Sequence, residues 1–234
     1  MSRTPDQPTN TDARPDAVGR AGRGRVAPVE GGMRAVHQAV LHAFAAGAPP
    51  AERALDEAAA PFGVSGTEVL AQLHAEDFLR LDQAGAIQAA YPFSAVPTAH
   101  RVRIDGGAEV YSMCAIDALG IASMLDRDTV IRSEDPQTGA SITIQVAGDG
   151  ATTWQPATAV VMAGRVDGQS DSECCEPVFE AAADVCCEQI NFFETPETAA
   201  AWALAHPQVT GQIRDQAGAH ASGVAIFGRL LNES

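Results

Sequence analysis

The chain has no lysine, so all 15 basic residues among its 234 are arginine, and they stand against 30 acidic residues. The formal net charge is therefore −15. A protein this acidic gains nothing from approaching nucleic acid or an anionic membrane surface, because like charges repel each other. The composition excludes general nucleic-acid and membrane partners and favours small or cationic ligands.

Long apolar runs are also missing, since no stretch reaches the roughly 18 apolar residues that a membrane-spanning helix needs. Residues 1–32 are rich in Pro, Gly, Asp, Thr and Arg and have no apolar centre, so they do not resemble a secretory signal and predict a disordered tail. These features predict a cytoplasmic protein with reduced thiols. Its five cysteines are then expected to be ligands or nucleophiles rather than a disulfide framework.

Aromatic residues make up only 5% of the chain, but hydrophobic residues reach 46%, enough for one sizeable core or two small ones. Residues 33–95 show three amphipathic helical segments followed by a hairpin pattern, which is typical of a winged helix. The third segment starts with a capping box, Ser65 to Glu68, and carries acids but no basic residue. This favours a structural or substrate-covering role over DNA binding.

Residues 96–234 predict an α+β domain with a mixed or antiparallel sheet and flanking helices. The segment 92–97 is expected to be a linker, and Asp105-Gly-Gly107 is a strong hairpin signal. Residues 113–125 and 195–206 follow helical patterns. The last segment, 221–231, fits either a strand or a helix. Strands are expected at 129–131, 142–146, 158–162 and 190–193.

Cys114 and Asp117 carry the chemistry that the sequence suggests most directly. Three positions apart on a helix, they share one face, which places a soft metal ligand beside a proton carrier. Because Cys114 lies at the predicted helix start, its thiol pKa is expected below the usual 8.5 or so. Burial would raise the pKa of Asp117 and a nearby metal would lower it. The alternatives are a buried, inert cysteine and a solvent-facing aspartate.

The other four cysteines form two adjacent pairs. Cys186 and Cys187 lead into the apolar run 190–193, and in an extended segment only one of them can point into a given site. A thiol from Cys187 would complete a two-sulfur clamp for a thiophilic metal bound to carbon. The earlier pair, Cys174 and Cys175, has no zinc-finger spacing. All four thiols together can bind Cu(I), Zn(II) or Hg(II), and the alternative is a loop whose cysteines do nothing specific.

Several motifs together resemble the organomercurial lyase (alkylmercury lyase) family over residues 33 to 231. They are Tyr111-Ser-Met-Cys-Ala-Ile-Asp117, Pro136-Gln-Thr-Gly139, Cys187 placed five residues before Phe192, and a C-terminal helix starting at Thr195. The chain departs from the family in having Met113 where Trp is frequent, and Glu188-Gln-Ile-Asn191 where His residues often stand.

The resemblance implies protonolytic cleavage of the carbon–mercury bond of R–Hg⁺ to a hydrocarbon and Hg(II). Cys114 and Cys187 would be the mercury ligands and Asp117 the proton carrier, close to the Hg(II) product. No cofactor would be needed, while external low-molecular-weight thiols and a mercuric reductase would accept the metal. Cys174, Cys175 and Cys186 are candidate accessory thiols, as a relay or a separate trap. The alternative function is a thiol-based mercury- or copper-binding or metal-sensing protein without lyase activity.

Overall fold

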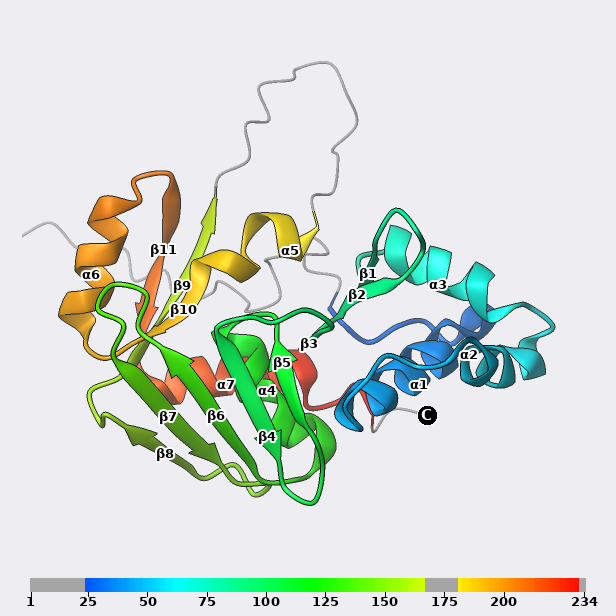
Figure 1. Ribbon diagram of the computed structural model, residues 1–234, viewed down its shortest axis with the longest axis horizontal. Helices are drawn as coiled ribbons and strands as arrows, with labels where there is room; N and C mark the ends of the chain where they lie inside the picture. The colour runs from blue at the N-terminus through cyan, green and yellow to red at the C-terminus, as the bar shows by residue number, and fades with distance from the viewer. Residues whose placement is uncertain (1–23, 167–180, 232–234) are drawn as a thin grey trace, which may run out of the picture.

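The computed structural model of the chain describes residues 24–166 and 181–231, and it confirms the α+β class (Figure 1). Every strand pairing in its two sheets is antiparallel. The large sheet has eight strands in the order β1-β2-β3-β5-β4-β6-β7-β8, and the small sheet has the order β10-β9-β11.

In chain order the helices are α1 (Met33–Ala45), α2 (Glu52–Ala59), α3 (Gly66–Ala75), α4 (Ala115–Leu125), α5 (Ala182–Val185), α6 (Pro196–Ala205) and α7 (Gln216–Phe227), with short 3-10 turns η3 (Glu30–Gly32), η4 (Ala60–Phe62) and η5 (Cys187–Gln189). The strands are β1 (Leu79–Leu81), β2 (Ile87–Ala90), β3 (Phe93–Ser94), β4 (His100–Ile104), β5 (Glu109–Ser112), β6 (Thr129–Glu134), β7 (Ser141–Val146), β8 (Thr152–Gln155), β9 (Val160–Val166), β10 (Ile190–Phe193) and β11 (Val209–Arg214).

The first three helices and the β1–β2 hairpin follow the order expected from the sequence. At the start of α3 the capping box is present, because the Glu68 N–H donates to Ser65 Oγ at 3.2 Å and the Ser65 N–H donates to Glu68 Oε2 at 3.0 Å. The structure departs from the expected tail, since Arg25 and Ala27 are only 8% and 1% exposed. Residues 24–32 thus belong to the packed protein, whereas residues 1–23 lie outside the described part.

The segment expected to be a linker contains β3. This two-residue strand pairs with β2 through Phe93 and Ala90, and with β5 through Phe93 and Ser112. Backbone hydrogen bonds therefore continue from the three-helix module into the strand that ends two residues before Cys114. This continuity fixes where the module lies relative to the cysteine motif.

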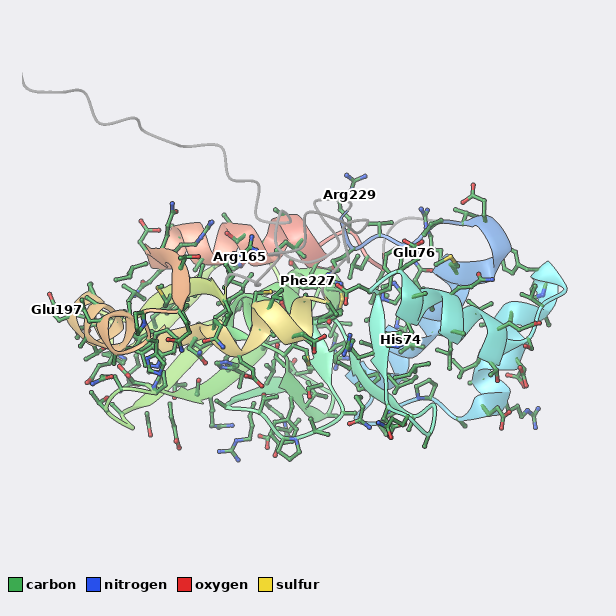
Figure 2. All side chains as sticks on the ribbon, turned by 90° about the horizontal axis from the view of Figure 1, so that it is seen from above. His74, Glu76, Arg165, Glu197, Phe227 and Arg229 are labelled. Carbon is green, nitrogen blue, oxygen red and sulfur yellow. The ribbon has the colours of Figure 1, made fainter. Side chains whose placement is uncertain are left out.

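Helix α4 is buried along most of its length, as expected for its nearly continuous apolar sequence. It contacts strands of the large sheet on one side and α7 on the other. Figure 2 shows the molecule from above, with Phe227 of α7 near the middle, Glu197 of α6 at one end and His74 of α3 in the module toward the other end. The segment 221–231, for which strand and helix were both open, falls mainly in helix α7.

Helices α4 and α7 approach each other at two glycines. A Cβ atom on Gly223 would lie 2.8 Å from both the Gly120 nitrogen and the Ile116 oxygen. We expect Gly223→Ala to lower the melting temperature, because overpacking costs about 1–3 kcal/mol and outweighs the roughly 1 kcal/mol gain in helix propensity. Ala225→Gly, at an exposed position of α7, measures how much helix propensity alone changes the melting temperature. A higher melting temperature for Gly223→Ala would contradict this close packing.

Asp135, fully buried, joins the large sheet to the small one. Its carboxylate accepts hydrogen bonds from Gln137 N in the β6–β7 turn at 2.7 Å, and from Glu194 N and Thr198 Oγ1 at 2.8 and 2.7 Å. The turn motif at residues 136–139 is thereby tied to the start of α6. Among the described residues, no helix has the length and apolar character needed to cross a membrane.

Candidate functional site

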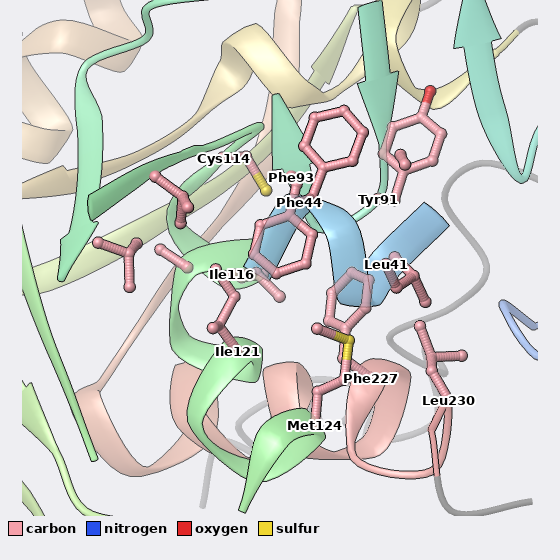
Figure 3. Packing of buried hydrophobic residues seen from close by; sticks show 14 of the residues in the cluster. Leu41, Phe44, Tyr91, Phe93, Cys114, Ile116, Ile121, Met124, Phe227 and Leu230 are labelled. Carbon is pink, nitrogen blue, oxygen red and sulfur yellow. The ribbon is translucent and has the colours of Figure 1, made fainter. Parts of the chain in front are cut away.

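Cys114 is the N-cap residue of α4, directly after β5 and outside the helix in extended conformation. Two hydrogen bonds fix this segment to Pro92, from the Met113 N–H at 3.0 Å and from Ser112 Oγ at 3.1 Å. The Cys114 side chain is 1% exposed and lies in the buried cluster drawn in Figure 3, which also contains Tyr91 and Phe93. The β3 region of the chain thus sets the position of the first thiol.

Asp117 lies in the first turn of α4, and its backbone N–H donates to Cys114 Sγ at 3.4 Å. Its side chain is 7% exposed, and within the described residues no group donates a hydrogen bond to Oδ2. Burial raises the Asp117 pKa to about 7, although Arg25 and the Cys114 thiol oppose the shift. Burial is therefore the dominant effect on this carboxyl, which can carry a proton near neutral pH.

Cys187 approaches the same point from another part of the chain. It follows α5, begins the turn η5, and precedes β10. The Cys187 and Cys114 thiols are neighbours that shift each other's pKa, and Cys114 is the first cause that holds the Cys187 pKa well above its usual range. The sequence separation of these two cysteines is 73 residues, so only the fold brings the two sulfurs together.

The expectation of an activated Cys114 thiol was wrong. Burial raises the Cys114 pKa to about 11, and the contacts with the Cys187 thiol and the Asp117 N–H only partly offset that rise. Burial outweighs the stabilisation of a thiolate by the helix N-terminus, because a thiolate removed from water loses its hydration. Cys114 and Cys187 therefore both rest as neutral thiols near neutral pH.

The expectation that Cys186 and Cys187 lie in an extended segment was also wrong. Residues 182–189 form a short helix and a 3-10 turn rather than an extended segment. Cys186 Sγ donates to the Ala182 carbonyl at 3.2 Å, and the Cys186 side chain also contacts the Cys187 thiol. Cys174 and Cys175 lie outside the described residues.

The three described cysteines are all free and buried. Within residues 24–166 and 181–231, no group of three or more His, Cys, Asp or Glu side chains is arranged to hold a metal ion. The site consists instead of two adjoining thiols and one protonatable carboxyl. Such a set offers two soft ligands to a metal that prefers linear two-sulfur coordination, together with one proton source.

A stability measurement tests the raised Asp117 pKa. The folded protein keeps a proton on Asp117 that the unfolded chain releases near pH 3.8, so this group's contribution to stability is full below that pH and declines until about pH 7. Each unit of difference between the two pKa values is worth about 1.4 kcal/mol. We expect Asp117→Asn, which never ionises, to melt at a higher temperature than the unaltered protein at pH 8, with the gain disappearing toward pH 4. An equal gain at both pH values would contradict the shift.

Three residues near the site were missed in the sequence. Tyr91 is 1% exposed, and its pKa is raised first by burial and then by the nearby Cys187 and Asp77. Arg25 stands close enough to oppose the rise in the Asp117 pKa. Asp77 is the third, and its position directly after a helix resembles that of a solvent-exposed residue. Arg25 lies in a segment whose composition is typical of a disordered tail. No local pattern marks them.

Comparison with known proteins places the chain among proteins of one family. The family model for alkylmercury lyase matches residues 93–228. Similar curated proteins include alkylmercury lyases of Staphylococcus epidermidis, 29% identical over 66% of both chains, and of Streptomyces lividans, 31% identical over 49% of this chain and 48% of that one. A third, from Pseudomonas putida, is 27% identical over 83% of this chain and 84% of its own length.

The first of these alignments spans just under two thirds of the relative's length and the second about half. The fold is similar to the crystal structure of the mercury-bound form of MerB2, with a TM-score of 0.67 and 22% identity over 87% of this chain and 92% of that chain. The matched segment contains β3, Cys114, Asp117 and Cys187 and covers more than half of the sequence. The chain therefore belongs to the alkylmercury lyase family.

Proposed function

We propose that the protein is an organomercurial lyase, which cleaves R–Hg⁺ to the hydrocarbon RH and Hg(II). One observation carries the proposal: the thiols of Cys114 and Cys187 are neighbours, and the Asp117 carboxyl belongs to the first turn of the helix that Cys114 caps. Mercury is thiophilic, and a carbon bound to it becomes a better proton acceptor as sulfur ligands add electron density to the metal. The site supplies both the sulfur ligands and a group that can donate a proton.

In the first step, Cys114 Sγ binds the mercury atom of R–Hg⁺ and gives up its proton. Asp117 is the nearest base, and with a pKa raised to about 7 it is partly ionised at neutral pH and can take that proton. The positive charge of the substrate offsets the burial that otherwise keeps the thiol neutral. Binding of the substrate itself therefore activates the sulfur.

In the second step, Cys187 joins the same mercury atom and loses its proton to solvent. Asp117 then delivers its proton to the carbon, the carbon–mercury bond breaks, and RH leaves. The balance is one R–Hg⁺ and two thiols giving RH, Hg(II) held by two thiolates, and one proton. No electrons change hands, so the reaction requires no redox cofactor.

Release of Hg(II) requires thiols from outside the site. Low-molecular-weight thiols, or the cysteines of a mercuric reductase, would exchange with Cys114 and Cys187 in the cytoplasm, where thiols stay reduced. Cys186 lies beside Cys187 and can act as an accessory thiol during this exchange. Cys174 and Cys175 are candidates for a relay or a separate metal trap.

Residues 33–95 would form a winged-helix-like domain that covers the site, and residues 96–234 the catalytic domain. Support comes from the order of three helices and a hairpin and from the contacts of Tyr91, in the first of these segments, with the Cys187 region. The net charge of −15 argues against DNA binding by this module.

Headspace gas chromatography of the purified protein with methylmercury and excess thiol tests the proposed activity. Methane released by native protein, and not by heat-denatured protein, supports the lyase reaction. Tight mercury binding without methane would instead favour the alternative, a thiol-based metal-binding or metal-sensing protein on this scaffold.

A further inference from the structure

Three buried polar side chains that the proposed reaction does not use form one cluster between the three-helix module and the Cys187 segment. Arg25, Asp77 and Tyr91 are 8%, 9% and 1% exposed. The Tyr91 hydroxyl donates to Asp77 Oδ1 at 3.1 Å. Arg25 donates to the Asp77 carbonyl and forms an ion pair with Oδ2 at 3.4 Å, and its guanidinium carbon lies 3.9 Å from the centre of the Tyr91 ring. These residues are called the polar cluster below.

The polar cluster holds the first two backbone amides of α5. The Ala182 N–H donates to Asp77 Oδ2 at 3.2 Å, and the Ala183 N–H donates to the Tyr91 hydroxyl at 3.1 Å. A further ion pair joins Arg80 of β1 to Asp184 at 3.1 Å. Figures 1 and 2 show α5 between the β1–β2 hairpin and the small sheet. The helix that leads directly into Cys186 and Cys187 is thus attached to the module.

The backbone at Asp77 shows why an aspartate there is notable. Asp77 adopts a left-handed conformation with φ of 56°, directly after the last residues of α3. The N–H groups of Phe78 and Asp77 donate to the carbonyls of Leu73 and His74, which is a Schellman ending. Glycine fits this position best, because it has no Cβ. The aspartate keeps the strained backbone and supplies a carboxylate that reaches a segment 105 residues away.

Tyr91 acts in this cluster as a fixed hydrogen-bonding group and not as an acid. Its hydroxyl donates to Asp77 and accepts from Ala183, so its proton is already in use. Burial and the neighbouring Cys187 and Asp77 raise its pKa, which keeps the proton in place. Because Cys187 is close enough to affect the Tyr91 pKa, the polar cluster lies beside the second thiol.

We propose that Arg25, Asp77 and Tyr91 are positioning residues that hold α5 and thereby keep the Cys187 sulfur against the Cys114 sulfur. This inference rests on the proposed lyase function and adds a role for the module in it. Cys114 is held separately, by Pro92 and the start of α4. Loss of the polar cluster would therefore release one sulfur of the clamp and leave the other in place.

Tyr91→Phe tests the role most cleanly, because it removes only the hydroxyl that bridges Asp77 and Ala183. Asp77→Asn is the second variant, since asparagine tolerates the left-handed backbone while it removes the charge. Asp135→Asn is the matched control, because Asp135 is also a buried, multiply hydrogen-bonded carboxylate but holds the β6–β7 turn, the start of α6 and the end of β10, away from Cys187.

The first readout does not depend on turnover. Full-length protein is treated with iodoacetamide, and peptide mass spectrometry gives the separate alkylation rates of Cys114 and Cys187. We expect both cluster variants to raise the ratio of Cys187 to Cys114 alkylation severalfold, while Asp135→Asn leaves it unchanged. A second readout is the transfer of bound Hg(II) to a competing dithiol, which should become faster in the cluster variants alone.

With methylmercury, kcat should fall roughly 10-fold to 100-fold in the cluster variants, the usual cost of losing a group that orients a metal ligand. KM should change little, because the first sulfur is untouched. The inference would be overturned if the cluster variants left the alkylation ratio unchanged. Their loss of activity would then follow the drop in melting temperature, as it should in Asp135→Asn. If the unaltered protein releases no hydrocarbon, the lyase proposal fails, while the alkylation ratio still decides whether the cluster positions Cys187.

Discussion

Cys114→Ser is expected to lower hydrocarbon release from methylmercury by on the order of 10⁴-fold or more, the scale seen when a catalytic nucleophile is removed. Oxygen is a poor ligand for a soft metal, so serine cannot replace the sulfur that first binds mercury. Serine does replace the cysteine well as an N-cap, because its hydroxyl accepts readily from the Asp117 N–H. The fold and the α4 start should therefore persist, and the loss can be assigned to the sulfur.

Single-turnover gas chromatography measures this loss, and circular dichroism at matched concentration checks the fold. Cys186→Ser is the matched control, since serine can still donate to the Ala182 carbonyl as the Cys186 thiol does at 3.2 Å. We expect that control to keep most of the activity. Hydrocarbon release by Cys114→Ser at a rate comparable with the control would contradict the role of Cys114.

Asp117→Asn should slow carbon–mercury cleavage by roughly 10² to 10⁴-fold, the range that a positioned general acid contributes. Asparagine has nearly the same shape and remains buried, but it cannot take a proton from the thiol and return it to carbon. Because both sulfurs remain, the variant should still bind one mercury atom for each protein molecule. It should accumulate bound organomercurial instead of product.

Two measurements separate these steps. Mercury content after gel filtration gives binding, and headspace chromatography gives cleavage. A loss of binding equal to the loss of cleavage would remove the proton-carrier role from Asp117, since a proton carrier acts after the metal is bound. Cleavage unaffected by the substitution would do the same.

The sequence predicted the α+β class and the closeness of Cys114 and Asp117. The two residues are close for a different reason than a shared helix face, because Cys114 is the N-cap of α4 and accepts a hydrogen bond from the Asp117 N–H. Cys187 was proposed as a second thiol because it precedes the apolar run 190–193, and its role as a mercury ligand came from the family resemblance, since no local pattern links residues so far apart. The pKa of Cys114 was predicted in the wrong direction. Its helix N-terminus can be read from the sequence, but the burial that outweighs it depends on the tertiary packing that leaves Cys114 1% exposed.

The polar cluster was beyond sequence analysis for a different reason. Arg25 lies in a stretch with the composition of a disordered tail, yet it pairs with Asp77, 52 residues further along the chain. Tyr91 reads as an ordinary apolar strand residue, although its hydroxyl makes two buried hydrogen bonds. Such long-range polar contacts leave no periodic trace, because each partner fits its own local pattern.

Strand β3 limits how this protein can be re-engineered. Because its two residues are hydrogen-bonded to β2 on one side and β5 on the other, a cut between residues 95 and 96 leaves β5 with an unpaired edge and removes the support of the Cys114 segment. The N-terminal helices therefore cannot be exchanged between relatives as an independent cassette. A chimera that keeps the thiol chemistry must place its junction before α1 or carry β3 together with β5.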